Sequence, residues 1–172
     1  MVLPLGYAND EPLKELMETF RRLPNVNFAL TGNAPSWMRK ESPPNVKFTG
    51  YISNEDYWGL VQDCDGVVAL TNRDFTMQRA GYEALICGVP HVTSTFDVLR
   101  EFYEDAAVYS NLDPESIVNA ISYLLENSAA LRESARSVLA RRRDEQLRTL
   151  EQLRGEDGTS VGSSETLGGR GA

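Results

Sequence analysis

Residues 65–92, in the middle of the chain, read DGVVALTNRDFTMQRAGYEALICGVPHV and indicate the fold class most clearly. Gly66–Leu70 is a continuous apolar run, which is typical of a strand buried on both faces of a sheet. A loop follows, and then a helix whose end is marked by Gly88 and Pro90. His91–Thr93 begins another strand. This strand–helix–strand order predicts a parallel sheet.

The flanking sequence continues the alternation of strands and helices. Ser53 and Asp113 are suited to begin helices, because each precedes an acidic first turn or a proline at the first helical position. We predict an α/β fold, a Rossmann-like three-layer sandwich with a mostly parallel sheet and right-handed crossovers. The expected strands are residues 2–5, 26–31, 46–49, 66–70, 91–93 and 106–109; the expected helices are 11–22, 53–63, 77–87, 97–103, 114–125 and 128–154, the last broken at most once.

A ligand of such a sheet is expected beyond the carboxyl ends of the strands. No GxGxxG sequence follows the first strand, so the usual dinucleotide-binding fingerprint is missing. Four segments should share this edge of the sheet: Gly6–Glu11, Gly32–Ser36, Thr71–Met77 and Thr93–Glu101.

Composition restricts the function further. The chain has 172 residues, 41% of them hydrophobic, and a net charge of −8. It is long enough for one domain, and its acidity argues against general nucleic-acid binding. No apolar run is long enough to span a membrane, and the N-terminus lacks the basic start of a signal peptide. Cys64 and Cys87 have no metal-ligand spacing, so we expect reduced thiols in a cytoplasmic protein.

The C-terminal end differs in composition from the rest. Residues 155–172 contain six of the 13 glycines and few residues that a core would bury. We expect a flexible, disordered tail there, and a single domain over residues 1–154.

The middle stretch also resembles a known family. A strand ending in Thr71, followed by a loop and a helix reading Glu83-Ala84-x-x-x-Gly88-x-Pro90, resembles the C-terminal, donor-binding domain of retaining glycosyltransferases with the GT-B fold, of the group 1 type. Upstream segments fit the same register: residues 25–32, 45–51 and 53–65. The resemblance covers residues 2 to about 150 and implies a nucleotide-sugar donor.

The resemblance assigns Glu83 to the two ribose hydroxyls of the donor; the alternative is a solvated helix carboxylate. The family's donor-sugar Glu falls on Phe75 here, so Asp74 is a hypothetical catalytic residue after a one-residue shift. Equally, Asp74 could be a polar loop residue or a helix cap. The full expected donor-binding set is Glu83, Thr76, Met77, Gln78, Gly6, Gly32, Arg79 and Glu101.

The chain departs from the family after its first strand. An Arg and a Lys that hold the pyrophosphate are replaced there by acids in Gly6–Pro12, and Arg79 or Lys14 either compensates or is a surface residue. His91 replaces a Val, and packing or a backbone hydrogen bond explains it better than a role as a catalytic base. Three aromatic residues are expected on helix faces or in the core: Trp37, Tyr57 and Trp58. Asp63-Cys64-Asp65 has the spacing of a metal motif but lies away from the predicted edge.

The resemblance implies transfer of a sugar from a nucleotide-activated donor to an unknown acceptor. No metal or other cofactor is expected, because helix N-terminal amides would stabilise the leaving diphosphate. A GT-B enzyme needs a second Rossmann-like domain, which we expect as an N-terminal partner. An apolar helix edge formed by Leu139, Leu147, Leu150 and Leu153 would suit it; equally, it could belong to an ordinary amphipathic helix packed on the sheet. The alternatives are a non-catalytic nucleotide-sugar-binding or partner-binding domain, and a sugar-nucleotide epimerase.

Overall fold

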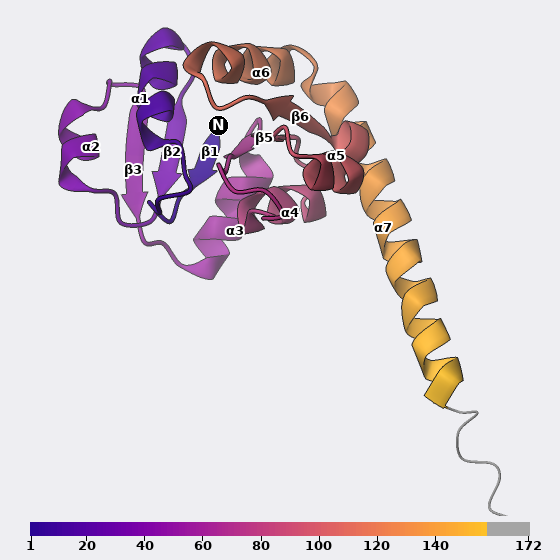
Figure 1. Cartoon of the computed structure of the whole chain (residues 1–172). Coiled ribbons are helices and arrows are strands. Elements are labelled where there is room, and N and C mark those ends of the chain that lie inside the picture. Colours follow the sequence, from indigo (N-terminus) through magenta and orange to yellow (C-terminus); the bar gives the residue numbers. More distant parts are fainter. Residues whose placement is uncertain (158–172) are drawn as a thin grey trace, which may run out of the picture. The chain divides into compact units, whose positions relative to one another are not determined.

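The structure, a computed structural model that describes residues 1–157, is built on one six-stranded sheet. Figure 1 shows this sheet with its helices. All neighbouring strands are parallel, in the order β3-β2-β1-β4-β5-β6. The predicted Rossmann-like α/β fold is therefore confirmed. The strands are β1 (Val2–Pro4), β2 (Phe28–Thr31), β3 (Val46–Gly50), β4 (Val67–Ala69), β5 (His91–Ser94) and β6 (Ala107–Ser110).

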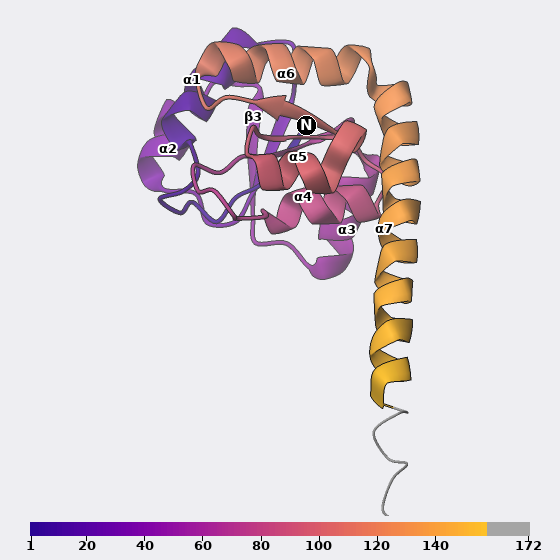
Figure 2. The same ribbon diagram turned by 45° about the vertical axis from the view of Figure 1, so that its right-hand side comes forward.

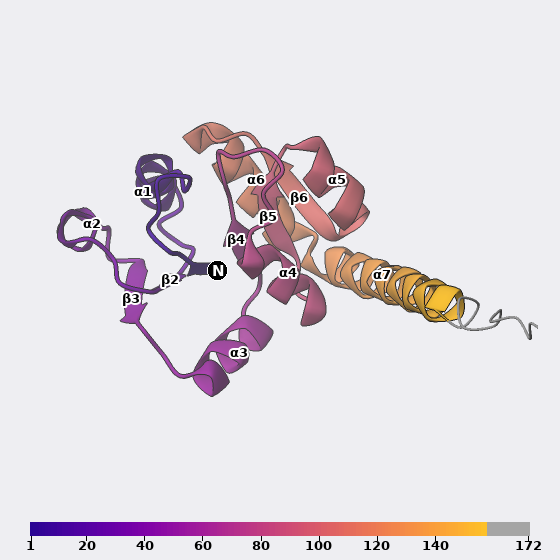
Figure 3. The same cartoon turned by 60° about the horizontal axis from the view of Figure 1, so that its bottom comes forward.

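Helices cover both faces of the sheet, as Figures 1 and 3 show. On one face Leu3 and Leu30 pack with Phe20 and Ile121 from α1 and α6. On the other, apolar residues of β1 and β4 pack against α3 and α4. The helices are α1 (Leu13–Arg22), α2 (Ser36–Glu41), α3 (Asn54–Asp63), α4 (Arg79–Ile86), α5 (Asp97–Tyr103), α6 (Pro114–Glu126) and α7 (Ser128–Asp157), with a 3-10 turn at Glu104–Ala106.

A third apolar cluster joins α4 to α5, which lie beside each other in Figure 2. Leu85 contributes from α4, Leu99 and Tyr103 from α5, and Ala135 and Val138 from the first turns of α7. The start of α7 is thus part of the core, because its small apolar side chains face the two helices.

Two details differ from the sequence predictions. The short helix α2 was not expected, since six residues contain too few apolar positions to show a helical period. The helix of residues 128–154 is one continuous helix to Asp157, so the break allowed there is wrong. The predicted caps are confirmed: Ser53 accepts the Asp56 amide, and Asp113 accepts the Ser116 amide.

The strand order fixes where a ligand can enter. The chain runs outward from β1 in one direction through β2 and β3, and in the other direction through β4, β5 and β6. The loops after β1 and β4 therefore leave toward opposite faces, which opens a crevice at the carboxyl ends of these two strands.

The chain divides into two units, Met1–Leu139 and Ala140–Ala172, and the whole sheet belongs to the first. In the second unit, the described part is helical, with an Arg142–Glu145 ion pair at 2.7 Å and three exposed leucines: Leu147, Leu150 and Leu153. Residues 158–172 of the predicted tail lie outside the described residues. Of the helices described, none has both the length and the apolar character needed to cross a membrane.

Candidate functional site

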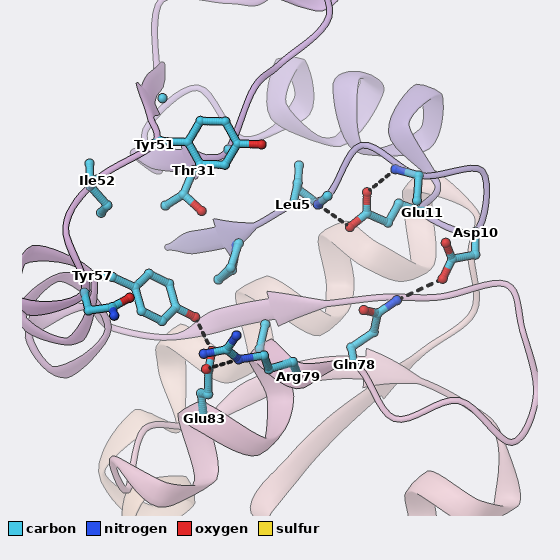
Figure 4. Close-up of a pocket in the computed structure, with 17 residues that line it drawn as sticks. Leu5, Asp10, Glu11, Thr31, Tyr51, Ile52, Tyr57, Gln78, Arg79 and Glu83 are labelled. Carbon is cyan, nitrogen blue, oxygen red and sulfur yellow. Dashed lines mark hydrogen bonds and ion pairs between the residues drawn. The ribbon is translucent and has the colours of Figure 1, made fainter.

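A cleft of about 480 Å³ opens at the carboxyl ends of β1, β2 and β3 and is bounded on the other side by the start of α4, the helix that follows β4. Four segments line it, and Figure 4 shows their side chains converging from different elements. They are the loop after β1 (Leu5–Glu11), the end of β2 (Thr31 and Gly32), the start of the β3–α3 segment (Gly50–Ile52, with Asn54 and Tyr57), and the start of α4 (Gln78–Ala80, with Glu83).

Glu83 lies on α4 at the base of this cleft, and its side chain is only 7% exposed. Both of its carboxylate oxygens have a donor: the Tyr57 hydroxyl donates to Oε2 and Arg79 Nε donates to Oε1, each at 2.5 Å (Figure 4). Each carboxylate oxygen can accept more than one hydrogen bond, so a ligand hydroxyl can still be bound. Because only 7% of its side chain is exposed and both oxygens have protein donors, Glu83 is not a solvated helix carboxylate.

Of the two side chains that donate hydrogen bonds to Glu83, Tyr57 is the neutral one. Burial, together with the hydrogen bond to Glu83, raises the pKa of Tyr57 well above its usual value. Its phenol therefore keeps its proton at neutral pH. Arg79 is different, because 83% of its side chain is exposed while its Nε reaches the buried carboxylate. One exposed cation and one half-buried phenol thus fix the position of the Glu83 carboxylate.

Asp10 ties together the two loops on either side of the crevice. Its Oδ2 accepts hydrogen bonds from the Thr71 hydroxyl and from Gln78 Nε2, both at 3.1 Å. Its backbone carbonyl accepts the Asn72 amide at 2.8 Å. The loop after β1 and the loop after β4 are thereby joined through hydrogen bonds, and two of the residues involved, Asp10 and Gln78, line the cleft.

The wall formed by the β3–α3 segment is aromatic and apolar. Gly50 has a φ of 70°, a left-handed conformation that glycine adopts without steric cost, and Tyr51 and Ile52 follow it. The Tyr51 side chain is exposed and stands over the cleft opposite α4 in Figure 4. A flat ligand could lie against this wall.

The structure brings five of the predicted donor-binding residues together in the cleft: Gly6, Gly32, Gln78, Arg79 and Glu83. Thr76, Met77 and Glu101 are not among its lining residues, and Glu101 lies within α5. Gly32 has a φ of 84°, and a Cβ there would lie 2.4 Å from the Leu5 carbonyl oxygen. A glycine is thus required where β2 passes the loop after β1.

Asp74, the predicted catalytic residue, lies in the exposed β4–α4 loop outside the cleft lining. Its Oδ1 accepts the amide of Phe75 at 2.7 Å, and Phe75 is itself left-handed, with a φ of 54°. Lys14 lines a different depression, so of the two cations suggested to compensate for the acidic loop, only Arg79 reaches the cleft.

The other singled-out residues have structural surroundings. His91 is fully buried, with its ring 4.3 Å from that of Tyr103, and burial lowers the pKa of His91 to about 3. The packing interpretation of His91 is confirmed. Asp63 and Cys64 line a separate cavity with Met1 and Asn27, away from the carboxyl ends of the strands. Both cysteines are free.

Three residues of the site were not predicted as site residues from the sequence: Asp10, Glu11 and Tyr57. The segment Gly6–Glu11 was expected at this edge of the sheet, but Asp10 and Glu11 were given no role beyond acids that replace cations, and Tyr57 was expected on a helix face or in the core. No local pattern identifies Asp10 or Tyr57, because their partners lie 26 to 68 residues away in the chain. The partners of Glu11 are close in sequence, but they depend on a loop conformation that no periodic pattern specifies. Over the described part of the chain, no cluster of three or more His, Cys, Asp or Glu side chains is arranged to hold a metal ion.

The comparisons with known proteins agree with this architecture. The family model described as "Glycosyl transferase-like" matches residues 11–151. No curated protein matches the chain by sequence.

Solved structures match over most of the chain at low sequence identity. HepE from Anabaena in complex with UDP superposes with a TM-score of 0.73 at 20% identity, covering 93% of this chain and 48% of HepE. Sucrose-phosphate synthase from Thermosynechococcus elongatus gives 0.74 at 18% identity, covering 92% of this chain and 46% of that one. The catalytic domain of cholesterol-alpha-glucosyltransferase from Helicobacter pylori superposes with a TM-score of 0.63 at 16% identity. This match covers 81% of this chain and 94% of that domain. The chain therefore spans about half the length of the first two proteins.

Proposed function

Because the chain belongs to the glycosyl transferase-like family and has the fold of one half of a GT-B enzyme, we propose that its cleft binds a nucleotide-activated sugar for transfer to an acceptor. The observation that carries the proposal is the buried Glu83 carboxylate, which is held in position at the base of the cleft. HepE, which shares the fold, is in complex with UDP. A nucleoside diphosphate is therefore a suitable ligand to test.

In this proposal Glu83 accepts hydrogen bonds from the ribose hydroxyls. A vicinal diol presents two donors, and a carboxylate accepts both with charge assistance, each bond contributing about 1.5–3 kcal/mol. Tyr57 and Arg79 act as positioning residues, because they hold the carboxylate without occupying all its lone pairs.

The leaving diphosphate would lie near the start of α4, where Gln78, Arg79 and Ala80 line the cleft. The free amides of a helix start and the positive end of its dipole favour an anion there. We propose that these groups, and not a metal ion, stabilise the charge that develops on the leaving group. The donor sugar would extend toward the β4–α4 loop, where Asp74 remains a hypothetical catalytic residue.

Two free cysteines fit a cytoplasmic location.

Calorimetry with UDP- and GDP-sugars tests the donor site. We expect wild type to bind one of the two series, and Glu83→Gln to bind it roughly tenfold to a hundredfold more weakly. Glu55→Gln is the matched control, because Glu55 is exposed and does not line the cleft. Equal affinities of wild type and Glu83→Gln, or no binding of either series, would contradict the proposal.

A non-catalytic nucleotide-sugar-binding domain is the second candidate. The observation that favours it is the acidic loop after β1, where Asp10 and Glu11 line the cleft. The two candidates differ in an assay of sugar transfer and nucleotide release with an N-terminal Rossmann-like domain supplied in trans. Binding without release supports the non-catalytic domain, and release of the nucleotide supports the enzyme. Release without an acceptor, with an altered sugar, would indicate the epimerase.

A further inference from the structure

The loop after β1 holds an internal anion. The Gly6 amide donates to Glu11 Oε1 at 2.9 Å, and the Ala8 amide donates to Glu11 Oε2 at 2.8 Å. Both oxygens of the carboxylate are therefore engaged by backbone amides of the same short loop. Figure 4 shows the Glu11 side chain turned back toward this loop at the edge of the cleft.

The backbone of the loop makes these two amides converge. Tyr7, which lies between the two donors, has a φ of 56°, in the left-handed region. A change of backbone handedness between successive residues turns their amides toward a common point, and such concave arrangements of amides bind anions. The bound anion here is a side chain of the protein itself.

Glu11 also lines the cleft, where its side chain is partly buried. Burial raises the pKa of the Glu11 carboxyl, and the amide hydrogen bonds act in the opposite direction. The carboxylate therefore depends on these amides for stabilisation that water would otherwise provide.

The charges around the loop do not favour a second anion. Among the residues that line the cleft, Asp10, Glu11 and Glu83 are acidic and Arg79 is the single basic residue. Arg79 is already paired with Glu83. A diphosphate that approached the loop would meet both carboxylates of Asp10 and Glu11, and would have to displace Glu11 to reach the amides of Gly6 and Ala8.

We propose that Glu11 is a specificity-determining residue that occupies the amides of the loop after β1 in place of a ligand phosphate. Its carboxylate weakens the contribution of the diphosphate to binding, so that the nucleoside supplies most of the affinity. This inference rests on the proposed function, because it concerns the diphosphate of the same ligand. Phosphate-binding loops leave such amides open to the ligand, whereas here the Glu11 carboxylate occupies them.

The test measures binding of uridine, UDP and inorganic pyrophosphate to the full chain by calorimetry. Glu11→Gln removes the charge but keeps a carbonyl oxygen that can accept from one amide, so the loop should keep its shape. We expect UDP and pyrophosphate to bind at least about tenfold more tightly to Glu11→Gln than to wild type, since a unit charge about 10 Å away at an effective dielectric of about 20 changes binding by that order. The affinity for uridine should stay within about twofold.

Glu15→Gln is the control, because Glu15 lies on α1 outside the cleft lining. A second measurement needs no variant: in wild type, raising the salt concentration should strengthen UDP binding relative to uridine by screening the repulsion. Unchanged or weaker binding of both UDP and pyrophosphate to Glu11→Gln would overturn the inference, as would salt that weakens UDP binding relative to uridine. Loss of uridine binding would count against the proposed function alone, since pyrophosphate reports on the loop independently of the nucleoside.

Discussion

A single side chain, Glu83, connects the sequence, the fold and the proposed chemistry. Its place in the Glu-Ala-x-x-x-Gly-x-Pro segment identifies it as a candidate site residue from the sequence. The structure adds its burial and its two donors, Tyr57 and Arg79. Arg79 is four residues earlier on α4, so this contact could be expected from helical spacing. Tyr57 comes from α3, and only the packing of α3 beside α4 brings it close.

Removing the Tyr57 hydroxyl should destabilise the protein. In Tyr57→Phe, Oε2 of the buried Glu83 carboxylate loses its donor, and the free energy of unfolding should fall by about 1–3 kcal/mol. Urea unfolding measures this. Tyr123→Phe is the control, because Tyr123 is exposed on α6 and its loss should change the unfolding free energy by less than about 0.5 kcal/mol. Equal stability of Tyr57→Phe and wild type would contradict the Tyr57–Glu83 hydrogen bond.

The burial of His91 makes the stability of the folded protein depend on pH, and the sign of this dependence follows from the lowered pKa. The pKa of His91 is about 3 in the folded protein and about 6.5 in an unfolded chain. Below pH 6.5 the unfolded chain takes up a proton that the folded protein does not, so stability falls as the pH drops from about 6.5 toward 3. At pH 5 the loss should be about 2 kcal/mol.

Since the chain has one histidine, the effect can be isolated. Thermal or urea unfolding of wild type and His91→Leu at pH 7 and pH 5 should show the extra loss in wild type only. The same pH dependence in both proteins would contradict a neutral, buried His91.

At the scale of elements, α4 joins the core to the cleft. Ala84 and Leu85 face the core, while Gln78, Arg79 and Glu83 face the cleft. The sequence predicted this helix and its glycine end, and Gly88 indeed has a φ of 65°. It did not predict the role of Gly81, because the close neighbours of that glycine, Tyr103 and His91, come from α5 and β5.

Adding a methyl group at Gly81 should therefore be costly. A Cβ at this position would lie 2.9 Å from the Tyr103 hydroxyl and 3.3 Å from the His91 ring. We expect Gly81→Ala to lower the free energy of unfolding by about 1–3 kcal/mol through overpacking. Gly59→Ala in α3 is the matched control, since a Cβ there meets nothing within 4 Å. It should raise stability by up to about 1 kcal/mol. If urea unfolding showed that Gly81→Ala is more stable than Gly59→Ala, the packing of α4 against Tyr103 and His91 would be contradicted.

At the scale of the whole molecule, the order of apolar runs and helices was sufficient to predict the sheet. Continuous runs such as Gly66–Leu70 are buried by helices on both faces, which leaves few alternatives to a parallel strand. The site was predicted only in part. Gly6 and Gly32 follow strands and could be placed at the carboxyl edge, whereas the hydrogen bonds of Asp10 and Glu11 depend on loop conformations that no periodic pattern specifies.

Because the chain divides into two units, we expect that the residues after Leu139 can be removed without loss of the fold or of the cleft. The sheet and all residues that line the cleft lie in Met1–Leu139, as do the core residues that α7 contributes. A chain that ends at Leu139 should unfold cooperatively and bind the same nucleotide within about twofold of the full chain. Calorimetry on both chains measures this. A tenfold weaker affinity of the shorter chain would show that residues after Leu139 are needed for the cleft.

A comparison of nucleosides tests whether Glu83 recognises the ribose of a nucleotide. Uridine and guanosine, each with its 2′-deoxy counterpart, would be titrated into wild type and Glu83→Gln. We predict that wild type binds one ribonucleoside roughly tenfold more tightly than its deoxy form, and that Glu83→Gln loses this preference. Equal affinity of wild type for both forms, or an unchanged preference in Glu83→Gln, would contradict ribose recognition by Glu83.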